Sequence, residues 1–286
     1  MPALNPLTAL GGLNPFGGAP LSLPLIATSG AGAGPVVQQT ATGSTSSNGP
    51  ASFTLTLTAS QVGSALVVFV AVNASSGAAL GATPAGWTLV ASQVVGTLAL
   101  GCYVYYNNPG GITSFVLGSP TATAGGIAGV GYEVLNAPFP SDVFLSATGS
   151  STTPASNASQ LVPPATNNMV LGVLAWVAGA VTLTFGNTVP TGTIATAQGA
   201  RTVSTVGTTN AAIQAAYFVQ PAMASSASTG FIIGGTLTGS VVWDGMIVNL
   251  RSLASDYSVG SADNDATKPG FAVIAGGQQA ISVGAL

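Results

Sequence analysis

Between residues 51 and 253 the hydrophobic and polar positions follow the short-period pattern of β-strands. Short apolar segments recur about every dozen residues, and Gly, Pro, Asn and Ser separate them. The segment 52–59, SFTLTLTA, alternates strictly, which predicts a strand with one solvated face. The segments 64–73, SALVVFVAVN, and 168–177, NMVLGVLAWV, are almost entirely apolar, which predicts strands buried between two layers. No segment has the period of an amphipathic helix, so the chain is predicted to be all-β.

The predicted strands form two series that resemble each other. Segment 64–73 resembles 168–177, LALGCYVYY at 98–106 resembles AIQAAYFVQ at 212–220, and the order of such matches is the same in both halves. Each half has too few strands to bury both faces of a sheet. We therefore predict a duplicated, jelly-roll-like antiparallel β-sandwich with halves at about 51–150 and 151–253. The expected strands are 52–59, 64–73, 86–95, 98–107, 113–118, 126–136, 142–148, 168–177, 181–186, 192–198, 211–220, 229–235 and 240–250.

The two ends of the chain lack this periodicity. Residues 1–50 combine frequent Pro and Gly with regularly placed apolar residues, which indicates an extended arm that lies in a groove on a neighbouring subunit. A strap over its own domain is the alternative. Residues 254–286 begin as a polar linker and end in a similar apolar arm. The residues expected to anchor the arms are Leu4, Leu7, Leu10, Leu13, Phe16, Leu23, Leu25, Ile26, Phe271, Val273, Ile274 and Ile281.

Charge is scarce along the whole sequence. Charged residues make up 3% of the chain, with six acids, three bases and a net charge of -3. Nucleic-acid binding is not expected, because phosphate contacts require clustered Lys and Arg. Hydrophobic residues make up 47%, so the chain is expected to fold rather than remain disordered. A surface of uncharged polar residues does little to keep molecules apart, which favours a permanent assembly.

Residues suited to catalysis are equally scarce. The sequence has no His and a single cysteine, Cys102, which excludes Ser–His–Asp triads, Cys–His nucleophiles and an internal disulfide. Glu133, Asp142 and Asp244 are the candidates for a pair of catalytic carboxylates. Glu133 and Asp244 are placed at roughly matching positions of the two halves, and we interpret them as outward-facing acids that aid solubility. We expect no enzyme activity and no cofactor.

Two further patterns are interpreted as structural. The cluster Asp263, Asn264 and Asp265 is faintly similar to a calcium loop but lacks the Gly and distal Glu of an EF-hand, so we expect a polar linker and no metal. Aromatic residues could form a sugar-binding platform, but within strands they more often pack in the core. The aromatic residues predicted to form the structural core are Trp87, Tyr103, Tyr132, Trp176, Tyr217 and Trp243.

No targeting or membrane segment is predicted. The N-terminus lacks the basic region of a signal peptide. The longest apolar run, 64–72, is about half the ~20 residues that a membrane-spanning helix needs. We expect synthesis in the cytoplasm and no membrane partner.

Several short motifs resemble a β-sandwich domain of tailed-bacteriophage structural proteins. They are Gly86-Trp87-Thr88, Tyr132 with a following Asp142, Asn168-Met169-Val170 and Trp243-Asp244-Gly245, and the resemblance spans about residues 50–252. Thr193 stands where the family often has a Trp. Domains of this family are jelly-roll-like modules of phage heads, tails and fibres, so the resemblance implies a structural protein of the virion.

The resemblance and the two arms together predict a capsid decoration, or cement, protein on the capsid surface. Its arms are expected to anchor it to the major capsid protein or to sister subunits, in a homo-oligomer that we expect to be a trimer. One alternative is a tail or fibre adhesin that binds a host surface glycan. Another is a tail-tube or filament subunit.

Overall fold

Strands account for all the regular secondary structure that is described. The computed structural model describes residues 34–45, 52–75, 77–106, 108–120, 126–137, 139–156, 168–178, 181–187, 194–203, 210–220, 232–251, 271–272 and 281–282. Within these ranges the chain is all-β, as predicted, with antiparallel pairing throughout. The same ranges contain no helix long and apolar enough to cross a membrane.

The first half of the chain forms a five-stranded sheet covered by a strand pair. The sheet order is β1 (Val36–Ser44), β7 (Ile127–Leu135), β3 (Ala65–Asn73), β5 (Leu98–Tyr105) and β4 (Trp87–Val95). The pair β2 (Ser52–Thr56) and β6 (Ser114–Gly118) packs on the outer face through residues such as Phe53 and Phe115. Strand β3 is completely buried because both of its faces are covered.

The second half repeats this arrangement. Its sheet order is β8 (Phe139–Ser151), β14 (Val241–Arg251), β9 (Asn168–Ala178), β12 (Asn210–Gln220) and β11 (Ile194–Val203), which matches β1, β7, β3, β5 and β4 in turn. The pair β10 (Leu183–Phe185) and β13 (Gly235–Leu237) packs on the outer face of this sheet. The identical order of the five strands is a topological duplication, although the outer pairs differ, because β2 precedes β3 whereas β10 follows β9.

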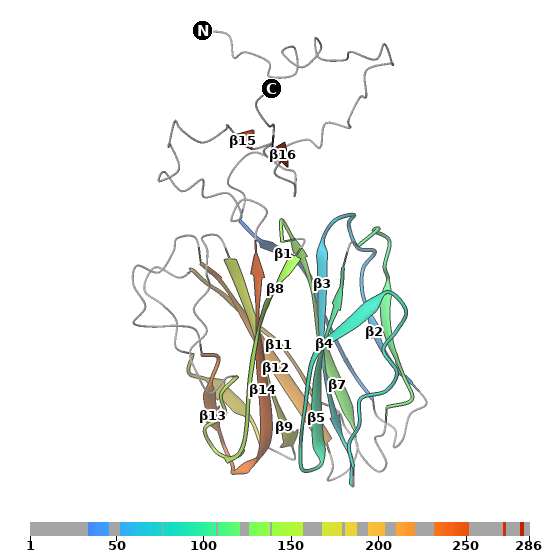
Figure 1. Ribbon diagram of the computed structural model, residues 1–286. Coiled ribbons are helices and arrows are strands. Elements are labelled where there is room, and N and C mark those ends of the chain that lie inside the picture. The colour runs from blue at the N-terminus through green and yellow to red at the C-terminus, as the bar shows by residue number, and fades with distance from the viewer. Residues whose placement is uncertain are drawn as a thin grey trace, which may run out of the picture. The chain divides into compact units, whose positions relative to one another are not determined.

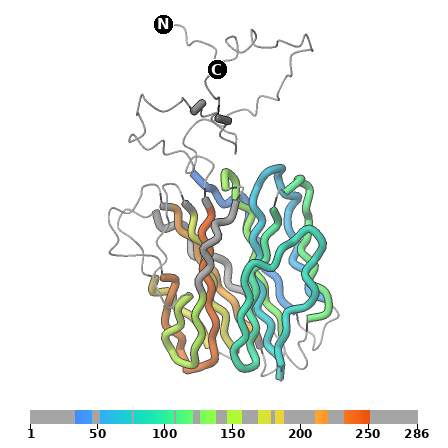
Figure 2. The backbone as a smooth tube through the Cα atoms, in the orientation of Figure 1, coloured from blue at the N-terminus to red at the C-terminus, as the bar shows by residue number. Residues whose placement is uncertain are grey.

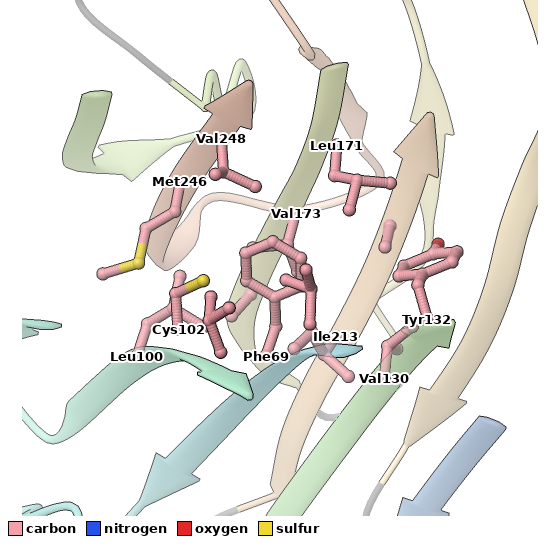
Figure 3. Close-up of a cluster of buried hydrophobic side chains, with 14 of the residues drawn as sticks. Phe69, Leu100, Cys102, Val130, Tyr132, Leu171, Val173, Ile213, Met246 and Val248 are labelled. Atoms are coloured by element: carbon pink, nitrogen blue, oxygen red, sulfur yellow. The ribbon is translucent and has the colours of Figure 1, made fainter. Parts of the chain in front are cut away.

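The two large sheets pack face to face and give a sandwich of four layers (Figure 1). The central cluster between them includes Phe69, Leu100, Leu171, Ile213 and Met246, which project from both sheets toward one another (Figure 3). Two outer clusters lie beneath the strand pairs β2–β6 and β10–β13. At about 25 cal/mol per Å² of buried apolar surface, these clusters are the main stabilising feature of the fold.

The halves face each other like the subunits of a symmetric dimer. Strand β12 lies over β7 and β3, β14 lies over β5 and β4, and β11 lies over β1. The strands of one sheet therefore face those of the other in reversed order, with the equivalent strands β3 and β9 at the centre, as an internal twofold axis along the strands requires. Residues 32–260 form one compact unit that contains both sheets.

The described core begins and ends at the same end of this sandwich, here called the terminal end (Figures 1 and 2). Strand β1 begins at Val36, opposite Leu135 at the end of β7, and β14 ends at Arg251. The rings of Tyr132, near the end of β7, and Tyr217, near the end of β12, are 5.9 Å apart and connect the two sheets there. Both terminal segments of the sequence are therefore joined to the sandwich at this end.

Glycines allow the outer layers to approach the central strands. A Cβ on Gly129 of β7 would lie 2.8 Å from the ring of Phe53, and a Cβ on Gly245 of β14 would lie 2.4 Å from the carbonyl oxygen of Ala155. The strand registers place these two glycines at equivalent positions of the two halves. The close packing of each outer layer therefore depends on a residue without a side chain.

The domain begins earlier in the sequence than predicted. Strand β1, Val36–Ser44, falls within the segment 1–50 that was assigned to the arm, yet it pairs with β7 over its whole length. Its sequence, VVQQTATGS, hides the strand because it lies at a sheet edge and contains no large apolar residue besides valine. The expected arm residues from Leu4 to Ile26 lie outside the described residues.

The C-terminal segment contributes one short described pairing. Strand β15 (Phe271–Ala272) pairs with β16 (Ile281–Ser282). The other two predicted anchors of this arm, Val273 and Ile274, lie outside the described residues, as does the cluster Asp263, Asn264 and Asp265.

Candidate functional site

The Gly-Trp-Thr motif contributes Trp87 to a buried group of aromatic side chains. The Trp87 amide donates to the Pro84 carbonyl at 3.1 Å, and Gly86 has a φ of 83° that favours glycine. This turn places Trp87, 8% exposed, edge-on to Tyr105 and Phe115, with ring centroids 5.5 and 4.9 Å away. The motif thus serves packing within the first half.

The other predicted core aromatics also lie within the layers. Trp176 is fully buried and donates from Nε1 to the Val181 carbonyl at 3.2 Å, and Trp243 donates from Nε1 to Ser151 Oγ at 3.0 Å. Tyr103 and Tyr132 are buried, whereas Tyr217 is only partly buried against the central cluster. 

The alignment of Tyr103 with Tyr217 is wrong by one residue. Tyr103 faces the outer cluster and Tyr217 faces the central cluster. Neighbouring residues of a strand point to opposite faces, so the counterpart of Tyr103 by strand register is Ala216.

The two carboxylates placed at matching positions are neither matched nor exposed. Glu133, 1% exposed, points to the outer side of the first sheet, whereas Asp244, 0% exposed, points between the two sheets. By strand register the counterpart of Glu133 is Asn249, and the counterpart of Asp244 is Ala128. Our interpretation of these acids as outward-facing is therefore wrong, and the structure does not bring them together as a catalytic pair.

Glu133 is the centre of a buried hydrogen-bond network. Its Oε1 accepts from the Gln61 backbone amide at 2.6 Å and from Ser64 Oγ at 2.7 Å, and its Oε2 accepts from Gln39 Nε2 at 2.6 Å. Gln39 in turn holds the backbone of Thr58 through two hydrogen bonds of 2.8 Å. One carboxylate thus connects strand β1 with the segment that precedes β3. Three donors offset much of the cost of burying its charge.

The network continues through Asn108 and Ser60. Asn108 Nδ2 donates to Ser64 Oγ at 2.7 Å and to the Gln61 carbonyl at 3.0 Å. Ser60 Oγ donates to Asn108 Oδ1 at 3.2 Å, and it accepts from the backbone amide of Ile112 at 3.0 Å. The loop between β5 and β6 is therefore fixed against the loop between β2 and β3.

A small polar hollow lies beside this network. It is lined by Gln38, Gln39, Thr58, Ala59, Gln61 and Glu133, and its volume is about 150 Å³. Gln38 is the extra residue of a β-bulge in β1, which widens the strand at this point. The hollow has room for a few water molecules or a small polar group.

Asp244 is buried, and neither carboxyl oxygen accepts a hydrogen bond of standard geometry, although the Gly245 backbone amide lies close enough to influence it. Loss of hydration raises its pKa to about 7, and the Gly245 backbone amide opposes this rise only in part. Below pH 7 the buried carboxyl group is therefore mostly protonated. Burial likewise raises the pKa of the Cys102 thiol, which removes its nucleophilic character.

The described surface carries no charged side chain. Among the residues whose side chains are described, Glu133 and Asp244 are the charged ones, and both are buried. The same residues contain no group of three side chains that could hold a metal ion. The side chain of Asp142, the third candidate acid, lies outside the description, as does Thr193.

The residues of the Glu133 network were not identified from the sequence. Gln39, Gln61, Ser64 and Asn108 are ordinary polar residues near strand ends, and nothing in their local pattern indicates that they meet. The sequence Ser-Gln-Val-Gly-Ser at 60–64 gives the one usable signal, because its Ser and Gly residues are typical of a turn. The apolar Val62 lies within that turn.

Comparisons with known proteins give no relative. No family model matches the chain, and no curated protein or solved structure is significantly similar to it.

Proposed function

We propose that the protein is a non-enzymatic structural protein of a tailed-phage particle, and specifically a capsid decoration protein. The observation that carries the proposal is a rigid four-layer core whose described surface is uncharged, joined at one end to two apolar terminal segments. Such a surface favours permanent contacts that depend little on salt. The motifs that resemble phage β-sandwich domains support the same assignment.

The terminal segments are the proposed anchors. Apolar residues from Leu4 to Ile26 would bury surface against the major capsid protein or sister subunits, at a gain of roughly 25 cal/mol per Å². The entropy of ordering the segments offsets part of this gain. The proposed assembly is a homo-oligomer, expected to be a trimer.

Immunogold labelling of intact particles with an antibody against residues 51–253 tests the assignment. Labels spread over the head are expected. Labels at the tail tip would instead indicate an adhesin, and labels along a tube or filament would indicate a tube subunit. The adhesin alternative has little support, because the aromatic side chains that a glycan platform would need are largely buried among the described residues.

A truncation tests the anchoring role. The deletion must end before Gly34, because removal of residues 1–48 would also delete strand β1. Deletion of residues 1–33 is expected to abolish particle binding while the β-rich circular dichroism spectrum is retained. Full particle binding by this variant would disprove the role of the N-terminal segment.

A further inference from the structure

The turn at residues 60–63 presents an apolar tip to solvent. The Ser64 amide donates to the Gln61 carbonyl at 3.3 Å, and Gly63 has a φ of 76°, which is the geometry of a type II turn with Val62 at its first central position. Val62 is 79% exposed, more than any other large hydrophobic side chain in the described residues. A tip of this kind gains nothing for folding.

The Glu133 network holds this turn from below. The Gln61 amide donates to Glu133, its carbonyl accepts from Asn108 Nδ2, and the Gly63 amide donates to the Asn108 carbonyl at 2.9 Å. The chain thus buries a carboxylate and an amide to immobilise a solvent-exposed turn. A contact that is fixed in advance loses little conformational entropy when a partner binds.

Two other exposed apolar residues lie at the same end of the sandwich. Val36, 53% exposed, is opposite Leu135 at the end of β7, and Tyr106, 38% exposed, follows the last residue of β5. The register of β3 with its two neighbours places the 60–63 turn at this end as well. The terminal end therefore combines an immobilised apolar tip with further apolar surface.

The chemistry of this end fits a second copy of the same chain. The described side chains of this end carry no charge, so they exert no electrostatic repulsion on an identical surface and offer no charge complementarity to a charged partner. The side chains of Asp142 and Arg251, in strands that also reach this end, lie outside the description. The chain continues from this end into residues 1–33 and 252–286, and the sequence from Leu4 to Ile26 supplies apolar side chains that a neighbouring copy would offer to Val62. A single turn buries too little surface for a stable interface, so it would act as one fixed contact within a larger one.

We propose that the 60–63 turn, with Val62 at its tip, is a preformed contact for self-assembly that binds a second copy of this chain. This inference rests on the proposed role as an assembly subunit. It adds to that role the surface that makes the contact and the identity of the partner.

Cross-linking of mixed isotopic samples tests the proposal on the full chain. Val62→Cys places an accessible thiol at the tip, and the native Cys102 does not compete because it is buried. The thiol carries a benzophenone maleimide, ¹⁴N and ¹⁵N protein are mixed in denaturant and refolded together, and cross-linked peptides are identified by mass spectrometry. Val116→Cys is the matched control, because Val116 is 43% exposed on the outer pair β2–β6.

Mixed-isotope cross-links are expected at least tenfold more often from Val62→Cys than from Val116→Cys. Cross-links within single copies alone would identify the chain's own segments as the occupant and overturn the proposal. A yield no higher than that of Val116→Cys would also overturn it. Sedimentation gives a second readout, in which Val62→Asp should weaken self-association at least tenfold and Val116→Asp should leave it unchanged. If mixed cross-links form but immunogold labels no particle, the proposed function fails while this inference stands.

Discussion

The two halves share one strand order but treat the same buried polar position in opposite ways. Glu133 in β7 and Asn249 in β14 are equivalent by register, and a bulge in the neighbouring edge strand accompanies each. Glu133 accepts three hydrogen bonds, whereas neither polar atom of the Asn249 side chain has a partner. In the first half, the buried polar side chain at this position has its hydrogen bonds completed by a network. In the second half, the equivalent side chain is polar but belongs to no such network.

A second difference lies between the sheets. Asp244 of the second half interrupts the central cluster with a carboxyl group, and its counterpart Ala128 is apolar. The second half therefore holds two buried polar side chains without partners, and each costs stability. The fold tolerates these buried polar residues because the central and outer hydrophobic clusters supply most of the stabilisation. The comparison indicates that the first half has a hydrogen-bond network at this position that the second half lacks, and that this network supports the turn at residues 60–63.

The largest effect is expected from Trp87→Ala, which should lower the free energy of unfolding by about 3–5 kcal/mol. The remaining tryptophans, Trp176 and Trp243, both belong to the second half, so their fluorescence in a urea titration reports on that half alone. Because the halves share the central cluster, this signal should shift together with the circular dichroism. An unchanged fluorescence midpoint would mean that the halves unfold independently.

Asp244→Asn should make the stability less dependent on pH. The folded-state pKa of about 7 lies above the value of ~3.9 for an unfolded chain, so the folded protein binds the additional proton between these values. Stability linked to this group is complete below pH ~4 and declines until about pH 7, by about 4 kcal/mol. Among the described side chains of the packed strands β4, β5, β8 and β9, Cys102 is the titratable one that faces the same layer. Urea titrations at pH 4 and pH 8 should show a gain for Asp244→Asn at pH 8 only, and equal gains at both values would contradict the shift.

Glu133→Gln should destabilise the first half by about 1–3 kcal/mol. The new amide would place a donor against Gln39 Nε2, and Gln39 cannot turn over without losing both of its bonds to Thr58. Hydrogen exchange at the amides of Gln61 and Gly63 should accelerate more than exchange in β9. Uniform acceleration would show that the network has no local role.

The matched change in the second half, Asn249→Leu, should act in the opposite direction. Removal of an amide without partners should raise the free energy of unfolding by about 1 kcal/mol, as measured by urea titration. A loss of stability comparable to that of Glu133→Gln would mean that Asn249 has an essential partner and that the halves are alike.

The smallest effect on folding is expected from Val62→Ser, because the side chain is exposed. The change in unfolding free energy should stay within about 0.5 kcal/mol. Since the Glu133 network is untouched, the circular dichroism spectrum should not change either. A larger loss would place Val62 in the folded core rather than at a contact surface.

The sequence predicted those parts of the fold that depend on local pattern. The apolar runs of β3 and β9, together with the similarity of 98–106 to 212–220, identified buried strands and a duplication. The edge strand β1 was missed because half-exposed valines, glutamines and threonines carry little pattern. Equivalent positions were also misassigned, since identical letters suggested a match of Tyr103 with Tyr217 that the alternation of strand faces forbids.

The candidate site could not be predicted from the sequence for a different reason. Its hydrogen bonds join residues far apart in the chain, such as Gln39 with Glu133 at a separation of 94 residues and Ser64 with Asn108 at 44. Only the sheet order brings these side chains together, so no local window could reveal them. The same order turned two acids that had been interpreted as solvent-exposed into buried groups with different surroundings.

The position of both chain connections at the terminal end determines how the sandwich would respond to force. A load applied between residues 34 and 251 enters at one end, so it cannot shear β1 along its full length against β7. Instead it would peel β1 away one pair at a time, beginning at Val36 and Leu135 and moving toward Ser44 and Ala128. Peeling breaks bonds in succession and yields at low force, whereas β14 is held between two neighbours in its sheet. Under tension, β1 is therefore the element that would extend first and absorb strain before the four-layer core gives way.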